Sequence, residues 1–192
     1  MTNEPPAGLR ANLRTAYAAM PPESFEPSED GEMDAGKMDT WRKLMFGLLL
    51  FNAVILERRK FGPLGWNIAY GFTASDRDIC LEQTKLLVRD YDVVPFKVVT
   101  ELTAEVNYGG RVTDTWDRRT IKNQLYDFIN ADVLREAYAF SPSGHYKTIA
   151  AEDKEGYLAM IQELPVNAGP EVFGLHDNAD ITCAQNDQRG SV

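Results

Sequence analysis

Length, composition and charge set the first limits on what this chain can do. Its 192 residues, 44% of them hydrophobic, suit one globular domain with its own core rather than a multidomain enzyme. The net charge of -9 argues against nucleic acid and anionic membrane surfaces as partners, because both attract a positively charged footprint.

Cysteine usage and hydropathy narrow the setting. Cys80 and Cys183 lie far apart and form no C-x-x-C pair, which indicates a reducing, intracellular compartment. The N-terminus has no apolar signal core. The longest apolar run, MFGLLLFNAVIL, has about 12 residues, whereas a membrane-spanning helix needs about 20. We therefore expect a soluble protein without membrane contact.

The N-terminal third predicts a short helix, an acidic loop and a long buried helix. Leucines and a tyrosine spaced by fours predict a helix from near Gly8 that stops at Pro21-Pro22. Residues 22–37 are rich in proline, glycine and acidic side chains, so we expect a disordered, solvated loop there. From an Asp39 cap, DTWRKLMFGLLLFNAVILERRK is apolar on nearly every face and predicts the central buried helix.

Two helices are expected next. SDRDICLEQTKLLVRDY begins with Ser75 and Asp78 in an arrangement that resembles a capping box. Pro95 starts a further helix, PFKVVTELTAEVNY, with a seam of spaced apolar residues. The first helix should bury one face made of Ile79, Leu86, Leu87 and Tyr91. The seam of the second comprises Phe96, Val99, Leu102, Thr103 and Val106.

The remaining segments complete a mainly α fold. Thr113 or Asp114 should open a helix, and another should end before Pro165. FSPSGHYKTIA has the turn-bounded aromatic content of a small β-hairpin, and the C-terminal segment has the composition of an irregular tail. The expected buried stripes are Ile121, Leu125, Phe128 and Ile129 in the first helix and Tyr157, Ile161 and Leu164 in the second. The predicted fold class is a helical bundle with irregular loops.

The segment NYGGRVTDTWDRR, residues 107–119, is the most specified stretch of the chain. A phosphate-binding P-loop needs G-x-x-x-x-G-K-[ST], and the sequence contains no such motif. Gly109 and Gly110 fit a helix end with positive φ. Trp116 fits an anchor in the core or at an interface better than a platform for a nucleic-acid base.

Basic residues concentrate at two predicted helix ends of this acidic chain. They are Arg58, Arg59 and Lys60 at the first end and Arg111, Arg118 and Arg119 at the second. One interpretation is a solvated helix face. The other is a set of bidentate ion pairs with Asp114, Asp117 or carboxylates of a neighbouring domain. Both interpretations stay open.

Catalytic chemistry finds little support in the sequence. His145 and His176 lie in loop-like segments without a serine, cysteine or carboxylate at an interpretable spacing. Two histidines and two scattered cysteines do not form a zinc-binding pattern. We therefore predict no catalytic residue, no cofactor-binding residue and no metal ligand in this chain.

Several strings together resemble one protein family. EPPAGLRANL, LMFGLLLFNAVILERRKFGPLGWNIAYGF, AEVNYGGRVTDTWDRR, FSPSGHY and PEVFGLHDNADIT, in this order, are similar to the end of the motor ring of dynein heavy chains. ERRKFGPLGWN and VTDTWDRR are closer to the axonemal than to the cytoplasmic type. Within these strings the structural or interface candidates are Arg58, Arg59, Trp66, Gly109, Gly110, Arg111, Trp116, Arg118 and Arg119.

The resemblance implies a place in the ring. The chain would be the C-terminal part of the sixth AAA+ module, mostly its helical lid, just before the C-terminal domain. Residues 1–21 would end the large subdomain, 22–37 form the acidic flexible loop, 38–165 the lid, and 166–192 an irregular tail. Asn52, where relatives commonly carry histidine, and HYKTIA, where they have an aromatic-proline ending, leave the isoform open.

The resemblance also implies a function. The parent would be an ATP-driven, minus-end-directed microtubule motor of the axoneme, with ATP and Mg²⁺ bound elsewhere, because the family's sixth module does not hydrolyse nucleotide. Its partners would be adjacent AAA+ modules, the C-terminal domain, microtubules, and dynein intermediate, light intermediate and light chains. The alternative is a stand-alone helical module that binds axonemal subunits through its acidic surface.

Overall fold

The computed structural model describes residues 7–180, in which helices of several kinds account for the regular structure. The α-helices are α1 (Leu9–Ala19), α2 (Ala35–Glu57), α3 (Ala74–Asp90), α4 (Phe96–Glu101), α5 (Thr115–Phe128) and α6 (Lys154–Gln162). Short 3-10 helices are η1 (Pro22–Ser24), η2 (Arg58–Leu64), η4 (Gly109–Arg111), η5 (Ala131–Leu134) and η6 (Pro170–Phe173), and η3 (Leu102–Asn107) is a π-helix. The predicted mainly α fold is confirmed.

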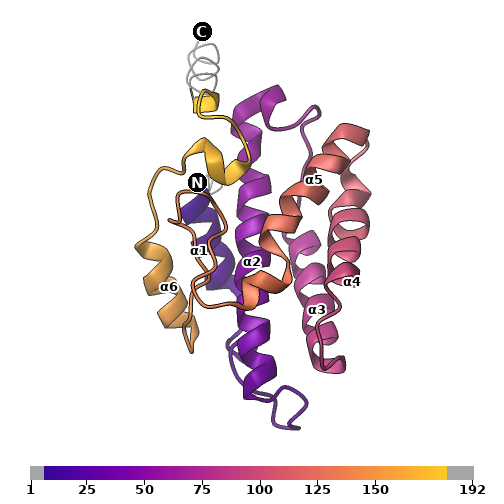
Figure 1. Ribbon diagram of the computed structural model, residues 1–192, viewed down its shortest axis with the longest axis vertical. Coiled ribbons are helices and arrows are strands. Elements are labelled where there is room, and N and C mark those ends of the chain that lie inside the picture. The colour runs from indigo at the N-terminus through magenta and orange to yellow at the C-terminus, as the bar shows by residue number, and fades with distance from the viewer. Residues whose placement is uncertain (1–6, 181–192) are drawn as a thin grey trace, which may run out of the picture.

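Helix α2 runs through the middle of the bundle, as Figure 1 shows. Most of its residues from Met38 to Ile55 are buried, which explains why its apolar residues surround the whole helix. The cap is Asp34, whose side chain accepts a hydrogen bond from the Lys37 amide at 2.8 Å. The expected Asp39 cap is therefore wrong: Asp39 lies inside the helix and pairs with Lys43 one turn later.

The other helices cover α2 from two sides. On one side α1 packs between α2 and α6, and Tyr17 stacks on Tyr157 with ring centroids 5.0 Å apart. On the other side α3 and α5 contact α2 directly, and α4 lies against them. The α2–α5 contact is close because Gly47 has no side chain: a Cβ there would lie 2.4 Å from the carbonyl oxygen of Phe128.

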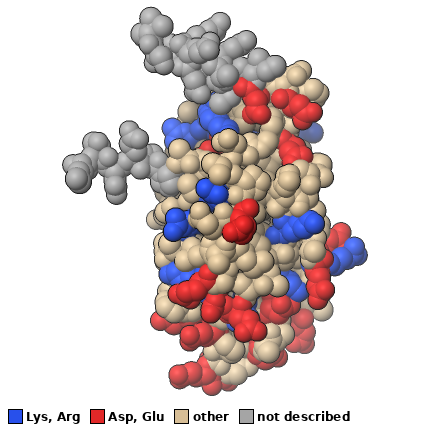
Figure 2. Space-filling model, turned by 90° about the vertical axis from the view of Figure 1, so that its left-hand side faces the viewer, with Lys and Arg blue, Asp and Glu red and all other residues tan. Residues whose placement is uncertain are grey.

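The acidic segment before α2 packs against the bundle, contrary to the expected disorder. Phe25 and Met33 are buried with 3% exposure each. The Trp41 indole N–H donates to the Ser24 carbonyl at 2.9 Å, and Arg42 donates to the Phe25 carbonyl. Two apolar side chains and these carbonyl contacts hold the segment, although its acidic side chains remain in solvent at the lower end of the molecule (Figure 2).

Helix α3 is turned relative to the expected orientation. Its capping box joins Thr73 and Asp76 rather than Ser75 and Asp78. Its buried residues are Asp76, Cys80, Leu81, Thr84 and Val88. Three of the four residues expected in the core are about half exposed: Ile79 at 49%, Leu86 at 46% and Tyr91 at 53%, while Leu87 is partly buried. The predicted face is therefore wrong.

The next helix is irregular. Helix α4 passes directly into the π-helix η3, a change of winding that the sequence pattern did not predict. Val99 and Thr103 are buried as expected, but Val106 is 59% exposed because the wider turn moves it out of the seam.

The C-terminal part combines confirmed and corrected expectations. Helices α5 and α6 bury the residues that their spacing predicted, and Asp114 opens α5. In FSPSGHYKTIA, Lys147 forms a single antiparallel bridge with Ala139, the residue just before this string, so residues 7–180 contain a hairpin-like turn without a regular strand. In the expected tail, Phe173 of η6 is fully buried against Phe61 at 5.1 Å. Residues 181–192, with Cys183, lie outside the described range. Within that range no helix is long and apolar enough to cross a bilayer.

Candidate functional site: a junction of two distant segments

Residues 58–73 and 107–119 meet beside the end of α2, and Arg58 is the first element of their junction. Arg58 is 4% exposed. Its Nε donates to the Gly65 carbonyl at 3.1 Å, and its Nη1 donates to the Phe173 carbonyl. Its guanidinium carbon lies 5.1 Å from the Trp66 ring centroid. One arginine therefore connects the end of α2, the following loop and the C-terminal segment.

The charge of Arg58 is partly compensated. Burial lowers the pKa of Arg58 from its usual value to about 10, while the nearby charge of Asp117 acts to raise it. The guanidinium therefore remains protonated near neutral pH. Two carbonyl acceptors and the face of Trp66 replace part of the water that the buried cation has lost.

Asp117 is the second element. Its carboxylate is 4% exposed and accepts hydrogen bonds from a loop 47 to 50 residues earlier in the chain. The Asn67 amide lies 3.0 and 3.1 Å from its two oxygens, the Ile68 amide 3.2 Å from Oδ2, and the Tyr70 hydroxyl 2.8 Å from Oδ2. A carboxylate that accepts several N–H and O–H donors holds this loop against the first turn of α5.

Asp114 reinforces the same contact. Its Oδ1 caps α5 by accepting from the amides of Trp116 at 2.9 Å and Asp117 at 3.0 Å, and it also accepts from the Asn67 side-chain amide at 3.1 Å. The Asp114 amide donates to the Tyr70 hydroxyl at 3.2 Å. The Asp117 amide, and then Asn67, lower the pKa of Asp114 through these hydrogen bonds. Burial, and then the bond to Asp117, raise the pKa of Tyr70.

The glycine pair in NYGG works differently from the expectation. Neither Gly109 nor Gly110 has a positive φ, so the predicted left-handed helix end is wrong. Gly109 instead lies against the preceding π-helical turn: a Cβ would be 2.0 Å from the Ala104 carbonyl oxygen. Gly110 faces open space. Tyr108, the residue just before Gly109, is buried, and its hydroxyl donates to Asn52 Oδ1 of α2 at 3.0 Å.

Only some of the predicted interface residues come together. Arg111 forms an ion pair with Asp76, with 2.6 Å between Nε and Oδ2, and Arg118 donates to the Val112 carbonyl at 3.0 Å. No ion pair joins an arginine to Asp114 or Asp117 in residues 7–180, so of the two open interpretations the pairing with these two aspartates is excluded there, while pairing with a neighbouring domain stays untested.

Trp116 lies on the surface rather than in the core. Its side chain is 66% exposed, and the Arg119 guanidinium lies 5.4 Å from its ring centroid. Arg59 is exposed on the neighbouring segment. The core alternative for Trp116 is therefore excluded, and the interface alternative stays a prediction. An exposed tryptophan beside arginine is typical of residues that contribute strongly to protein–protein contacts.

Sequence reasoning missed the anchoring role of Asp117 and its partners Asn67 and Tyr70. Asp117 lies in the segment NYGGRVTDTWDRR, but the sequence suggested it only as an ion-pair partner of the arginines. Its main partners are backbone amides, which carry no sequence signal at such a distance. His145 and His176 are both exposed loop residues, and the described residues contain no group of three or more His, Cys, Asp or Glu side chains suited to a metal ion.

Comparisons with known proteins agree with this architecture. The family described as "Dynein heavy chain AAA lid domain" matches residues 41–179, from the first part of α2 to just beyond η6. The chain is 47% identical over 186 residues, 95% of its length, to dynein axonemal heavy chain 12 of Homo sapiens. It is 49% identical over 188 residues, 97% of its length, to dynein axonemal heavy chain 1 of Homo sapiens. It spans 6% and 4% of these two relatives. The chain belongs to the dynein heavy chain AAA lid domain family.

Proposed function

We propose that this chain is a non-catalytic coupling element in the ring of an axonemal dynein, the ATP-driven, minus-end-directed microtubule motor of cilia and flagella. The relatives that support this proposal are named axonemal heavy chains, and the chain corresponds to 4–6% of their length. ATP and Mg²⁺ then act in the remainder of the parent chain. The lid lies in the sixth AAA+ module, just before the C-terminal domain.

The observation that carries the coupling role is the double fastening of residues 58–73. Asp117 fixes this loop to α5, and Arg58 fixes it to the end of α2 and to η6. Because α2 and α5 also pack on each other, a displacement of one helix is transmitted to the other through rigid contacts. A lid built in this way moves as a body when neighbouring modules change conformation.

The partners follow from this position. Adjacent AAA+ modules and the C-terminal domain of the same heavy chain would contact the lid directly. Intermediate, light intermediate and light chains, and microtubules, would be reached through the parent complex in the cytoskeleton of the axoneme. We assign Trp116 and Arg119, which lie against each other, to ring contacts, and exposed Arg59 is a separate candidate.

Oxidative footprinting of the tryptophans tests this assignment. In the 192-residue chain, hydroxyl radicals should modify Trp116 rapidly and Trp66 slowly, because their exposures are 66% and 4%. In the intact heavy chain, Trp116 should become protected while Trp66 remains protected, and Trp66 thus serves as the internal control. Equal modification of Trp116 in both preparations would contradict its place at a ring contact.

The stand-alone interaction module is less well supported. The similarity to heavy chains covers 95–97% of this sequence, as expected for a segment of such a chain. An antibody against residues 95–130 should detect a polypeptide of several hundred kilodaltons in a ciliary extract. A band near 21.6 kDa alone would instead favour the independent module.

A further inference from the structure

The outward side of α3 carries apolar side chains that no part of residues 7–180 covers. Ile79 and Leu86 are 49% and 46% exposed. They are seven residues apart and therefore lie on the same side of the helix, about 10 Å apart along its axis. A spacing of two helical turns matches the spacing of anchor residues on a partner helix.

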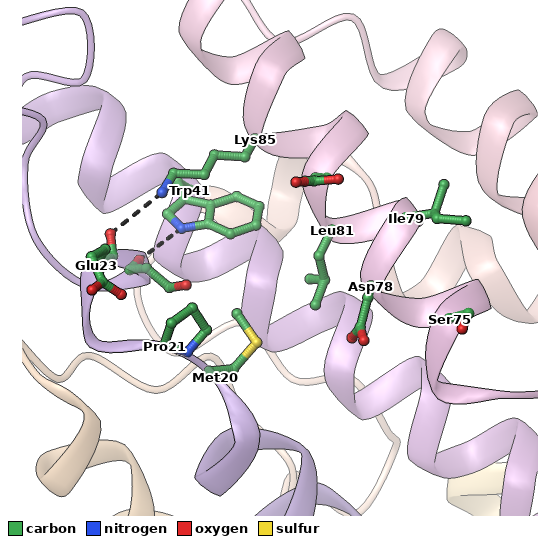
Figure 3. A pocket seen from close by; sticks show the side chains of 11 residues that line it. Met20, Pro21, Glu23, Trp41, Ser75, Asp78, Ile79, Leu81 and Lys85 are labelled. Carbon is green, nitrogen blue, oxygen red and sulfur yellow. Dashed lines mark hydrogen bonds between the residues drawn. The ribbon is translucent and has the colours of Figure 1, made fainter.

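Two hollows follow this side of α3. The first has a volume of about 570 Å³ and lies between α3 and the segment after α1, where Ile79, Met20 and Pro21 line it (Figure 3). The second, of about 470 Å³, includes Leu86 and Met33. Glu82 and Lys85 line both hollows, which therefore adjoin along α3, and we call the two together the α3 trough.

The wall of the α3 trough is held in place by specific contacts. Lys85 Nζ lies 5.8 Å from the Trp41 ring centroid and 3.4 Å from the Glu23 carbonyl oxygen. The Trp41 indole donates to the Ser24 carbonyl, and both hydrogen bonds are visible in Figure 3. Lys85 is therefore engaged in the wall of the trough. Arg89, the other basic residue among those lining the two hollows, pairs with Glu32 and Asp90.

The charge on the rim is negative. The carboxylates of Glu23 and Glu82 form no hydrogen bond or ion pair within the described residues, and Glu82 is exposed between the two hollows. Residues 22–34, which form the opposite wall, contain six acidic residues and no lysine or arginine. Asp78 and Asp30 line the two ends, although Arg77 neutralises the former. A positively charged partner is therefore favoured over an acidic one.

We propose that the α3 trough binds a basic amphipathic helix from outside these 192 residues. The apolar side chains of that helix rest between Ile79 and Leu86, and lysine or arginine side chains beside them face Glu23 and Glu82. The apolar contact supplies most of the affinity, and the acidic rim selects the charge of the partner.

Designed peptides test the proposal on the 192-residue chain. The first probe is an 18-residue leucine–lysine peptide, about five helical turns long, whose leucines are spaced so that they lie on one side of the helix. The second replaces every lysine by glutamate, and the third scrambles the leucine–lysine order. Titration calorimetry should show binding by the first probe, about tenfold or more weaker binding by the scrambled probe, and no measurable binding by the acidic probe.

Matched variants locate the binding. Replacing Ile79 and Leu86 together by alanine should weaken the lysine peptide about tenfold, and Glu23→Gln with Glu82→Gln should weaken it and flatten its salt dependence. Met160→Ala, an exposed apolar position on α6, and Glu136→Gln, an exposed acidic position, serve as controls and should leave binding unchanged.

Three results would overturn the proposal. They are no binding of the lysine peptide, equal binding of the scrambled or acidic peptide, and binding that the Ile79–Leu86 variant leaves intact. Sedimentation of the chain alone tests another occupant: dimerisation that the same variant abolishes would assign the trough to a second copy.

Discussion

At the residue scale, Gly109 is required because the backbone of the preceding turn approaches it closely, and not because its own backbone is left-handed. The π-helical turn brings the Ala104 carbonyl against Gly109, where any side chain would collide with it. The sequence pattern predicted a positive φ for this glycine, which the residue does not have. A helix end with positive φ and a glycine forced by contact look alike in a sequence, because both need the residue without a Cβ.

Substitution of the two neighbouring glycines distinguishes these causes. Gly109→Ala should lower the free energy of unfolding by about 2 kcal/mol or more, because a Cβ 2.0 Å from a carbonyl oxygen forces the backbone to move. Gly110→Ala should change it by less than about 0.5 kcal/mol, because its Cβ meets open space. Urea unfolding of both variants measures the difference, and equal effects would contradict the contact.

The second prediction at this scale concerns the contribution of Arg58 to stability. Arg58→Ala should destabilise the chain by about 2–4 kcal/mol, because the Gly65 and Phe173 carbonyls lose their donor and Trp66 loses a packing partner. Arg58→Lys should recover only part of this, since an ammonium cannot reach both carbonyls as a planar fork does. Exposed Arg59→Ala is the control and should have little effect on thermal unfolding. Full recovery by lysine would argue that charge alone matters.

At the element scale, the loop between α2 and α3 owes its conformation to Asp117. A carboxylate buried at the start of α5 receives three backbone or hydroxyl donors from Asn67, Ile68 and Tyr70. Removal of the acceptor leaves the buried Tyr70 hydroxyl and the two backbone amides without this partner.

Asp117→Ala should therefore destabilise the chain by about 2–3 kcal/mol and should loosen the loop specifically. Hydrogen exchange at the Asn67 and Ile68 amides should accelerate more than exchange in α6, which lies on the other side of α2. A uniform acceleration through the whole chain would show that Asp117 stabilises the fold globally rather than this junction.

The ion pair between Arg111 of η4 and Asp76 of α3 should make the stability of the chain depend on pH. Although partial burial acts to raise the pKa of Asp76, hydrogen bonds from Arg111 and Thr73 outweigh it and lower the pKa. The stability from this pair is present above the unfolded pKa of about 3.9 and is lost as pH falls through the folded value. Arg111→Ala should thus cost up to about 1 kcal/mol near neutral pH, since Arg111 is exposed. A cost that persists at about pH 2 would contradict the ion pair.

The elements also show how far the sequence could lead. Helix spacing predicted α1, α5 and α6 because each has one dominant apolar stripe, and the long apolar run predicted α2. Helix α3 has two competing faces: the larger side chains of Ile79 and Leu86 outweigh Cys80 and Thr84 in any hydropathy pattern, yet the smaller ones fit against α2. The roles of Asp117 and Arg58 depend on backbone partners from distant segments, which only the tertiary structure brings together.

At the scale of the whole molecule, the lid is held together as one connected body. The chain is a helical lid whose two fastened segments join α2, α5 and the C-terminal segment into one body. On the proposed function, that body transmits movement within a dynein ring. A weakened junction should therefore uncouple nucleotide turnover from movement before it abolishes turnover.

Microtubule gliding and ATP turnover, measured on the same heavy-chain preparation carrying Asp117→Asn, test this claim most directly. We expect basal turnover to stay within about twofold of the unsubstituted motor while gliding velocity falls by a larger factor. Glu152→Gln, an exposed acidic position, is the matched control and should alter neither quantity. Unchanged gliding, or a parallel loss of turnover and gliding, would contradict the coupling role.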